Sequence, residues 1–80
     1  MSTFEKVRDA AAEVLAIKPE EITMDSDFRT DLGADSLDFP ELFNTFEDIF
    51  GNKIPDDIAA DIKTVRDVVN YVDENFTKND

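Results

Sequence analysis

Residues 37–50 read Leu-Asp-Phe-Pro-Glu-Leu-Phe-Asn-Thr-Phe-Glu-Asp-Ile-Phe, and this stretch decides the fold. Its apolar residues recur at intervals of three and four, which is the spacing of one face of an α-helix. Gly51 follows directly and is typical of the residue that ends a helix. The pattern therefore predicts an amphipathic helix whose buried stripe is formed by Phe39, Leu42, Phe43, Phe46, Ile49 and Phe50.

The other face of this helix is predicted to be acidic. A rotation of about 100° per residue places four side chains opposite the apolar stripe, namely Asp38, Glu41, Thr45 and Asp48. Leu37 and Asn44 fall beside them, so Leu37 is expected to be an exposed apolar residue among carboxylates. Pro40 lies inside the predicted helix and disfavours helical geometry at the residue before it, so we expect an irregular first turn.

Three further helices are predicted on either side of this one. Residues 3–16 have helical spacing, with a capping-box pair, Ser2 and Glu5, at the start. Residues 55–61 begin with proline and two acids, which is typical of a short helix. Thr64 is expected to cap a last helix, whose buried stripe is Val65, Val68, Val69, Val72 and Phe76. The predicted fold class is all-α, a four-helix bundle with a short third helix and a long loop between helices one and two.

The predicted long loop covers residues 17–35. A loop of this length is uncommon in so small a domain and usually carries function or contains a short turn of its own. Four apolar residues are scattered along it, namely Ile22, Met24, Phe28 and Leu32. They leave open the simpler interpretation that the loop is a connector held to the core by these side chains.

Composition limits the partners and the location of the chain. Its 80 residues predict a single domain, residues 1–80, which we expect to be a monomer. The net charge of −12 repels nucleic-acid phosphates and anionic lipids but attracts basic protein surfaces, so we expect neither a nucleic-acid partner nor membrane insertion. No apolar run or basic leader suggests a membrane span or a signal peptide, so we expect the cytoplasm or an organelle matrix.

Cysteine and histidine are both absent from the sequence. Their absence removes thiolate nucleophiles, disulfides, the usual zinc ligands and triads that use imidazole as a base. We therefore predict no catalytic residue, no metal site and no enzyme activity.

The octet Asp31-Leu32-Gly33-Ala34-Asp35-Ser36-Leu37-Asp38 opens the second helix. It resembles the attachment motif of acyl carrier proteins, and the resemblance extends over essentially the whole chain through Ile54-Pro55-Asp56, Thr64-Val65 and Tyr71. The resemblance implies that Ser36 receives 4′-phosphopantetheine from coenzyme A through a Mg-dependent transferase. The chain would then hold acyl groups as thioesters and present them to biosynthetic enzymes.

The residues themselves agree with such a position for Ser36. We expect it at, or one residue inside, a helix N-terminus, where free N–H groups and the helix dipole favour a phosphate. The simpler interpretation is that Ser36 or Asp35 only caps the helix, and the two roles are compatible.

The resemblance also implies a docking surface for basic patches on partner enzymes. Residues 31–61 hold nine carboxylates and one cation, Lys53. The implied docking residues are Asp35, Leu37, Asp38, Glu41, Glu47, Asp48 and Asp56. An ordinary solvated helix face is the alternative interpretation of the same charges.

The resemblance further implies an acyl cavity that is lined by Phe46, Phe50, Ile54, Ile62 and Val68, although aromatic residues at this spacing are first of all core.

Two positions depart from the family pattern. Pro40 and Asn44 stand where the family generally has apolar residues that help docking, and Phe39 and Phe43 are bulkier than typical. These differences leave open, as an alternative to general fatty-acid synthesis, a carrier that serves a dedicated polyketide, lipid or modified-acyl pathway, and the additional aromatic residues favour short chains.

Other classes of protein remain as alternatives. Paired carboxylates can do acid/base work, but this chain offers no second domain to build a dry cleft. A calcium-binding loop that starts at Asp25 fails, since Thr30 stands where glycine is required and Ser36 where glutamate is required. An acidic interaction adaptor without a prosthetic group and a peptidyl or aminoacyl carrier stay open.

Overall fold

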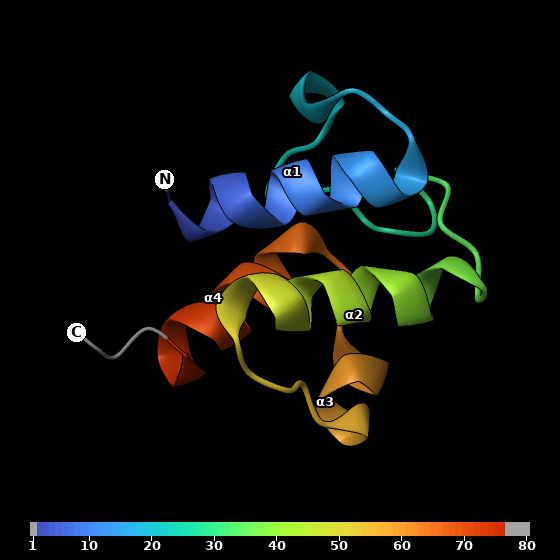
Figure 1. Cartoon of the computed structure of the whole chain (residues 1–80). Helices are drawn as coiled ribbons and strands as arrows, with labels where there is room; N and C mark the ends of the chain where they lie inside the picture. The colour runs from blue at the N-terminus through green and yellow to red at the C-terminus, as the bar shows by residue number, and fades with distance from the viewer. Residues whose placement is uncertain (1, 77–80) are drawn as a thin grey trace.

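The computed structural model describes residues 2–76 as a small helical protein (Figure 1). Its elements are α1 (Thr3–Leu15), the short 3-10 helix η1 (Pro19–Glu21), α2 (Asp38–Phe50), α3 (Asp56–Asp61) and α4 (Val65–Asn75). The described residues form no strand, and their one bridge of β type joins Asp27 to Thr64. The predicted all-α class, with four α-helices and a short third one, is confirmed.

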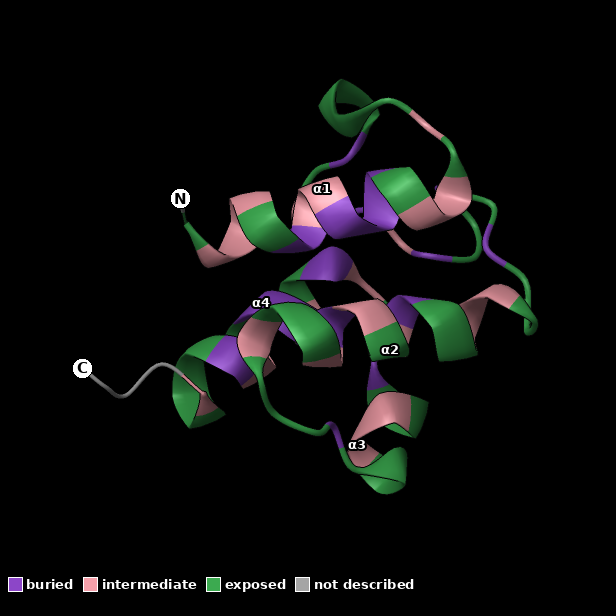
Figure 2. Cartoon of the chain, viewed as in Figure 1, coloured by how far each residue is buried: buried purple, intermediate pink, exposed green. Residues whose placement is uncertain are grey.

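The core lies between α1, α2 and α4. Figure 1 shows α1 above α2 and α4, and α1 packs against both of them. The faces that meet there are the buried stripes of the sequence pattern, drawn in purple in Figure 2. The largest side chains with almost no exposed surface are Phe28, Phe46, Leu42, Val7, Val65, Val68 and Val72. The predicted stripe of the fourth helix is confirmed as buried except at Phe76, which is half-buried. In α2 only Leu42 and Phe46 are fully buried, and Phe39, Phe43 and Phe50 pack half-buried against the core.

Two helices begin at the cap residues that the sequence predicts, Ser2 and Thr64, and both caps are capping boxes. At α1 the Glu5 N–H donates to the Ser2 hydroxyl (3.1 Å), and the Ser2 N–H donates to the Glu5 carboxylate (2.9 Å). Thr64 and Asp67 repeat this exchange at the start of α4. α1 ends at Leu15, one residue earlier than predicted, because Ala16 takes a left-handed conformation with φ 58°.

Ile49 is the exception to the predicted stripe of α2. Its side chain is 43% exposed and does not belong to the core cluster. It lies in the last turn of α2, which Figure 1 shows beside the beginning of α1. Thr3 and Phe4 of α1 are themselves only half-buried, so this end of the helix pair leaves Ile49 uncovered.

The long loop between α1 and α2 is well organised. Three of its four predicted apolar contacts, Ile22, Phe28 and Leu32, are buried, and Met24 packs against the core. Its backbone is also tied to the start of α4, since the Val65 N–H donates to the Ser26 carbonyl (3.0 Å). The Phe28 N–H donates in the same way to the carbonyl of residue 63 (3.0 Å). The loop is therefore part of the fold, and it fixes the chain that leads into α2.

Phe28 provides a test of this role. Its side chain is 1% exposed, and its ring lies 6.3 Å from the ring of Phe39 and 6.4 Å from that of Phe46. Phe28→Ala should lower the free energy of unfolding by about 3–5 kcal/mol, because it leaves a cavity at this junction. Urea denaturation measures the change, and Leu37→Ala, at a side chain that is 84% exposed, serves as the control, with a change within about 0.5 kcal/mol. Equal effects of the two substitutions would contradict this role.

Candidate functional site

Ser36 lies in the turn that precedes α2. Its side chain is exposed, and its hydroxyl forms no hydrogen bond with any other residue in the described range 2–76. α2 begins at Asp38 with Leu37 as its cap residue, so the predicted position of Ser36, at or just inside the helix, is wrong by one to two residues. Ser36 instead lies two positions before Asp38, the first residue of the helix, and its side chain is exposed.

Asp35 does the capping that the sequence left open between it and Ser36. The Leu37 N–H donates to the Asp35 carboxylate (2.8 Å), and the Asp35 N–H donates to the Asp38 carboxylate (3.0 Å). The Asp38 N–H also reaches the Asp35 carbonyl (3.0 Å). This reciprocal pair closes the turn around Ser36 and leaves its hydroxyl unused.

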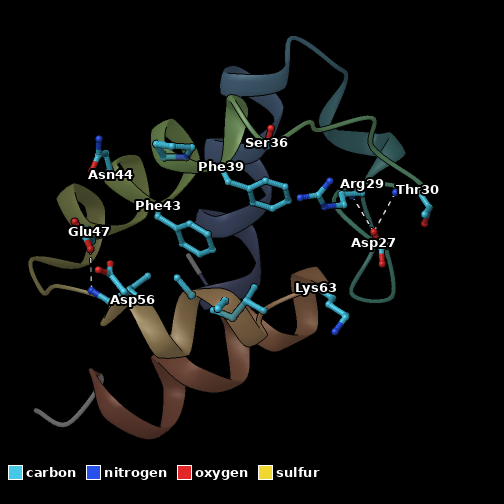
Figure 3. Close-up of a pocket in the computed structure, with 15 residues that line it drawn as sticks. Asp27, Arg29, Thr30, Ser36, Phe39, Phe43, Asn44, Glu47, Asp56 and Lys63 are labelled. Carbon is cyan, nitrogen blue, oxygen red and sulfur yellow. Dashed lines mark hydrogen bonds between the residues drawn. The ribbon is translucent and has the colours of Figure 1, made fainter.

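A second turn, just upstream, holds the other side of this segment. The carboxylate of Asp27 accepts hydrogen bonds from the N–H groups of Arg29 (2.8 Å) and Thr30 (3.0 Å), as Figure 3 shows. Because these bonds favour the ionised form, they hold the pKa of Asp27 below its usual value. The turn ends at Gly33, whose φ of 77° suits glycine, and the buried side chain of Ala34 follows. Ser36 thus lies between a hydrogen-bonded turn of the loop and the capped start of α2.

A pocket of about 690 Å³ opens beside Ser36, between α2, α3 and the long loop (Figure 3). Its apolar wall includes Phe39 and Phe43, whose rings are stacked with centroids 6.2 Å apart. The Arg29 guanidinium lies 5.1 Å over the ring of Phe39. The full lining is Asp27, Arg29, Thr30, Ser36, Phe39, Pro40, Phe43, Asn44, Glu47, Ile54, Asp56, Ala59, Ala60, Ile62 and Lys63.

The structure divides the residues that were predicted for the acyl cavity. Ile54 and Ile62 line the pocket. Phe46 and Val68 are fully buried in the core, and Phe50 packs against Phe76 with centroids 6.4 Å apart, so none of these three contributes to the pocket wall. Phe39 and Phe43 line the pocket in their place. Helical spacing puts all these rings on one broad stripe, and no signal in the sequence separates its buried centre from the edge that faces the pocket.

Most of the predicted docking residues lie on the surface. Asp35, Glu41, Asp48 and Asp56 are exposed, and Leu37 is 84% exposed beside them. None of the ion pairs within residues 2–76 involves any of these acids, since they join Arg8 to Asp9 and Arg66 to Asp25. This acidic face therefore has its charges available to another molecule.

Asp38 and Glu47 differ from the other predicted docking residues because they combine structural hydrogen bonds with partial burial, whereas Asp35 is hydrogen-bonded but exposed. Asp38 accepts from the Asp35 N–H, and Glu47 accepts from the Ile54 N–H at 2.8 Å, which joins α2 to the segment before α3. Part of the acidic helix therefore holds the pocket together.

Pro40 fits into α2 with little disturbance. It is the third residue of the helix, where a backbone N–H has no partner within the helix in any case. The helix begins one residue later than predicted, at Asp38 instead of Leu37. Pro40 and Asn44, the two departures from the family pattern, both line the pocket.

Residues 2–76 contain no cluster of three or more acidic, cysteine or histidine side chains that could hold a metal ion. Among them there is also no helix that is long and apolar enough to cross a membrane. The arrangement offers instead an exposed hydroxyl, a neighbouring pocket and an acidic surface.

Comparison with known proteins agrees with this geometry. The family model described as phosphopantetheine attachment site matches residues 5–72, which defines the class of protein. An acyl carrier protein from Campylobacter hominis is 46% identical over 79 residues, which cover 99% of each chain. The solved structure of Rv0033 from Mycobacterium tuberculosis, a proposed acyl carrier protein, is 32% identical with a TM-score of 0.84 over 91% of this chain and 97% of that one.

The chain belongs to the acyl carrier protein family, whose members are not catalytic and carry covalently attached 4′-phosphopantetheine. The site described above fits this group, because an exposed hydroxyl without an internal hydrogen bond stands at the mouth of a pocket. A buried serine hydroxyl would not have fitted.

The Asp27 turn gives the fold a dependence on pH. Since the pKa of Asp27 is lowered in the folded chain, its contribution to stability is fully present above the unfolded value, about 4, and is lost as the pH falls through the folded pKa. In Asp27→Asn the unfolding free energy should therefore decrease less steeply than in the unsubstituted chain as the pH drops below about 4. Thermal unfolding measured from pH 7 to 3 tests this, with Asp61→Asn, an exposed carboxylate without hydrogen bonds, as the control. A profile of Asp27→Asn that matches the unsubstituted chain would refute this role.

Proposed function

We propose that Ser36 carries the 4′-phosphopantetheine group and that the chain transports acyl groups on it between biosynthetic enzymes. The observation that supports this best is the exposed Ser36 hydroxyl, which has no internal hydrogen bond and lies next to the pocket. When bound, the group supplies a thiol on a flexible arm that forms thioesters. The Asp35 and Asp27 turns orient the attachment point.

Attachment requires a phosphopantetheinyl transferase. The Ser36 oxygen forms a bond to the pantetheine phosphorus of coenzyme A and loses its proton, while the phosphoanhydride bond breaks and adenosine 3′,5′-bisphosphate leaves. The exposed turn supports this step, because an enzyme can reach the hydroxyl without opening the core. The chain itself supplies no catalyst.

The acidic face is proposed as the docking surface for partners with basic patches. Asp35, Glu41, Asp48 and Asp56 would steer the encounter, and Leu37 would provide an apolar contact at its centre. Asp38 and Glu47 would add charge from their half-buried positions. Such a surface gives fast association that weakens with salt, which suits a carrier that visits several enzymes.

The cargo is proposed to lie in the pocket between α2 and α3. Ile54, Ile62 and the rings of Phe39 and Phe43 form its apolar wall, with Phe46, Phe50 and Val68 as supporting core. Pro40 and Asn44 at this pocket support a carrier dedicated to a specialised lipid or polyketide pathway over one for general fatty-acid synthesis. We further propose a monomeric single domain, residues 1–80, that acts in the cytoplasm.

Loading with coenzyme A tests the attachment site. Incubation with a broad-specificity phosphopantetheinyl transferase should add one phosphopantetheine group, as measured by intact-mass spectrometry. Ser36→Ala should abolish the adduct while keeping the helical circular dichroism spectrum, and Ser2→Ala should leave loading unchanged. An unmodified chain would support an acidic adaptor without a prosthetic group, and an adduct that survives Ser36→Ala would place the attachment elsewhere.

Charge removal tests the docking surface. The double variant Glu41→Gln/Asp48→Asn should lower kcat/KM of the transferase by about tenfold at low salt, because it weakens electrostatic steering. The difference should shrink at high salt. Glu13→Gln/Glu74→Gln removes the same charge from exposed positions on α1 and α4, and it should have little effect. Equal losses in the two double variants would show that only net charge matters.

A further inference from the structure

Two cations line the pocket beside Ser36 in a chain that has 20 acidic and 8 basic residues. They are Arg29 and Lys63. Two other cations, Arg8 and Arg66, form ion pairs of 2.9 and 2.7 Å with carboxylates. The side chains of Arg29 and Lys63 form neither an ion pair nor a hydrogen bond with any residue in the described range. Their positive charges are therefore available to a ligand.

The backbone holds these two residues on the same side of the pocket. Residue 28, next to Arg29, donates its N–H to the Lys63 carbonyl (3.0 Å), and Asp27 forms a bridge with Thr64. Figure 3 shows both cations on the side of the pocket that carries Asp27. The Arg29 N–H donates to the Asp27 carboxylate (2.8 Å), and the Arg29 guanidinium lies 5.1 Å over the Phe39 ring. Arg29 thus has a fixed backbone and an aromatic surface that directs its side chain.

None of the three carboxylates of the pocket forms an ion pair with these cations, although the charge of Arg29 is one of the causes that lower the pKa of Asp27. Asp27 accepts hydrogen bonds from the Arg29 and Thr30 N–H groups, and Glu47 accepts from the Ile54 N–H. Asp56 has no such bond, but Figure 3 shows it beside Glu47, away from Arg29 and Lys63. The pocket therefore has a cationic side next to an apolar wall, which is a surface for a ligand with an apolar body and a negative charge.

We propose that Arg29 and Lys63 bind an anionic group of the loaded arm. This inference rests on the proposed attachment at Ser36. The anion is the phosphodiester next to Ser36 or a carboxylate at the far end of the acyl cargo. In the second case Phe39 and Phe43 contact the methylene groups of a dicarboxylic acyl chain, and the two cations select it over an uncharged chain of equal length.

Four forms of the chain distinguish the two sources of the anion. They are the unmodified chain, the chain with the arm alone, and the chain loaded from pentanoyl- or glutaryl-coenzyme A, which differ in a terminal carboxylate. Intact-mass spectrometry first establishes that each form is loaded at Ser36. A chain that is not loaded at Ser36 would contradict the proposed attachment site, not the proposed role of Arg29 and Lys63. NMR of the Arg29 guanidinium and Lys63 ammonium groups then reports on an approaching anion, with Lys53, exposed and outside this pocket, as the internal control.

The expected result is a change at Arg29 and Lys63 that exceeds the change at Lys53. A change on adding the arm alone identifies the phosphodiester, and a change in the glutaryl form but not in the pentanoyl form identifies the carboxylate. The same signals in all four forms, or equal changes at Lys53, would overturn the proposal.

Charge-removal variants give an independent measurement. Hydroxylamine cleavage of the thioester reports on how well the cargo is sheltered. If the carboxylate is the ligand, Arg29→Gln/Lys63→Gln should speed cleavage of the glutaryl form by about threefold, as expected for a partly exposed ionic contact, and leave the pentanoyl form unchanged. If the phosphodiester is the ligand, both forms should be affected alike. Lys53→Gln should change the cleavage rate of neither form, and an acceleration as large as that in the double variant would contradict the proposal.

Discussion

The burial of Phe28 is the contact on which the rest of the structure depends. This side chain comes from the loop between α1 and α2, yet it packs against rings of α2, while its own N–H is bonded to the segment before α4. A single residue thereby joins three parts of the chain that are distant in sequence. The surroundings of Ser36 depend on this junction: the Asp27 turn contains Phe28, the Ala34 N–H donates to the Phe28 carbonyl, and the Phe39 ring of the pocket lies against the Phe28 ring.

Helix boundaries and most of the core were predictable because they depend on local rules. Apolar spacing identified α2 and α4, and the capping boxes at Ser2 and Thr64 marked two helix starts correctly. Ile49 was placed wrongly because spacing gives the direction of a side chain but not the end of the neighbouring helix. Ser36 was placed too close to the helix because Asp35 and Asp38 share the capping, and the sequence could not choose between neighbouring acceptors.

The pocket was the part that could be predicted least. Ile54 and Ile62 were predicted and line it, and Phe39 and Phe43 were noted as bulky side chains that affect the cargo, but Arg29 and Lys63 were not anticipated as members of the same site. Arg29 and Lys63 are 34 positions apart, and backbone bonds between the loop and the start of α4, among them the one between residues 28 and 63, bring them together. Such a pairing depends on tertiary structure, which no pattern within a short window reports. The acidic character of α2 was clear from the sequence, whereas the structural bonds of Asp38 and Glu47 were not.

The unbonded hydroxyl of Ser36 has a consequence for how often the chain can be used. The aspartates on either side close the turn between themselves, so a substituent on the serine oxygen breaks no internal bond of the fold. A group attached at this oxygen would therefore leave the turn that Asp35 and Asp38 close intact. A molecule that is filled and emptied over many cycles can thereby do so without repeated refolding.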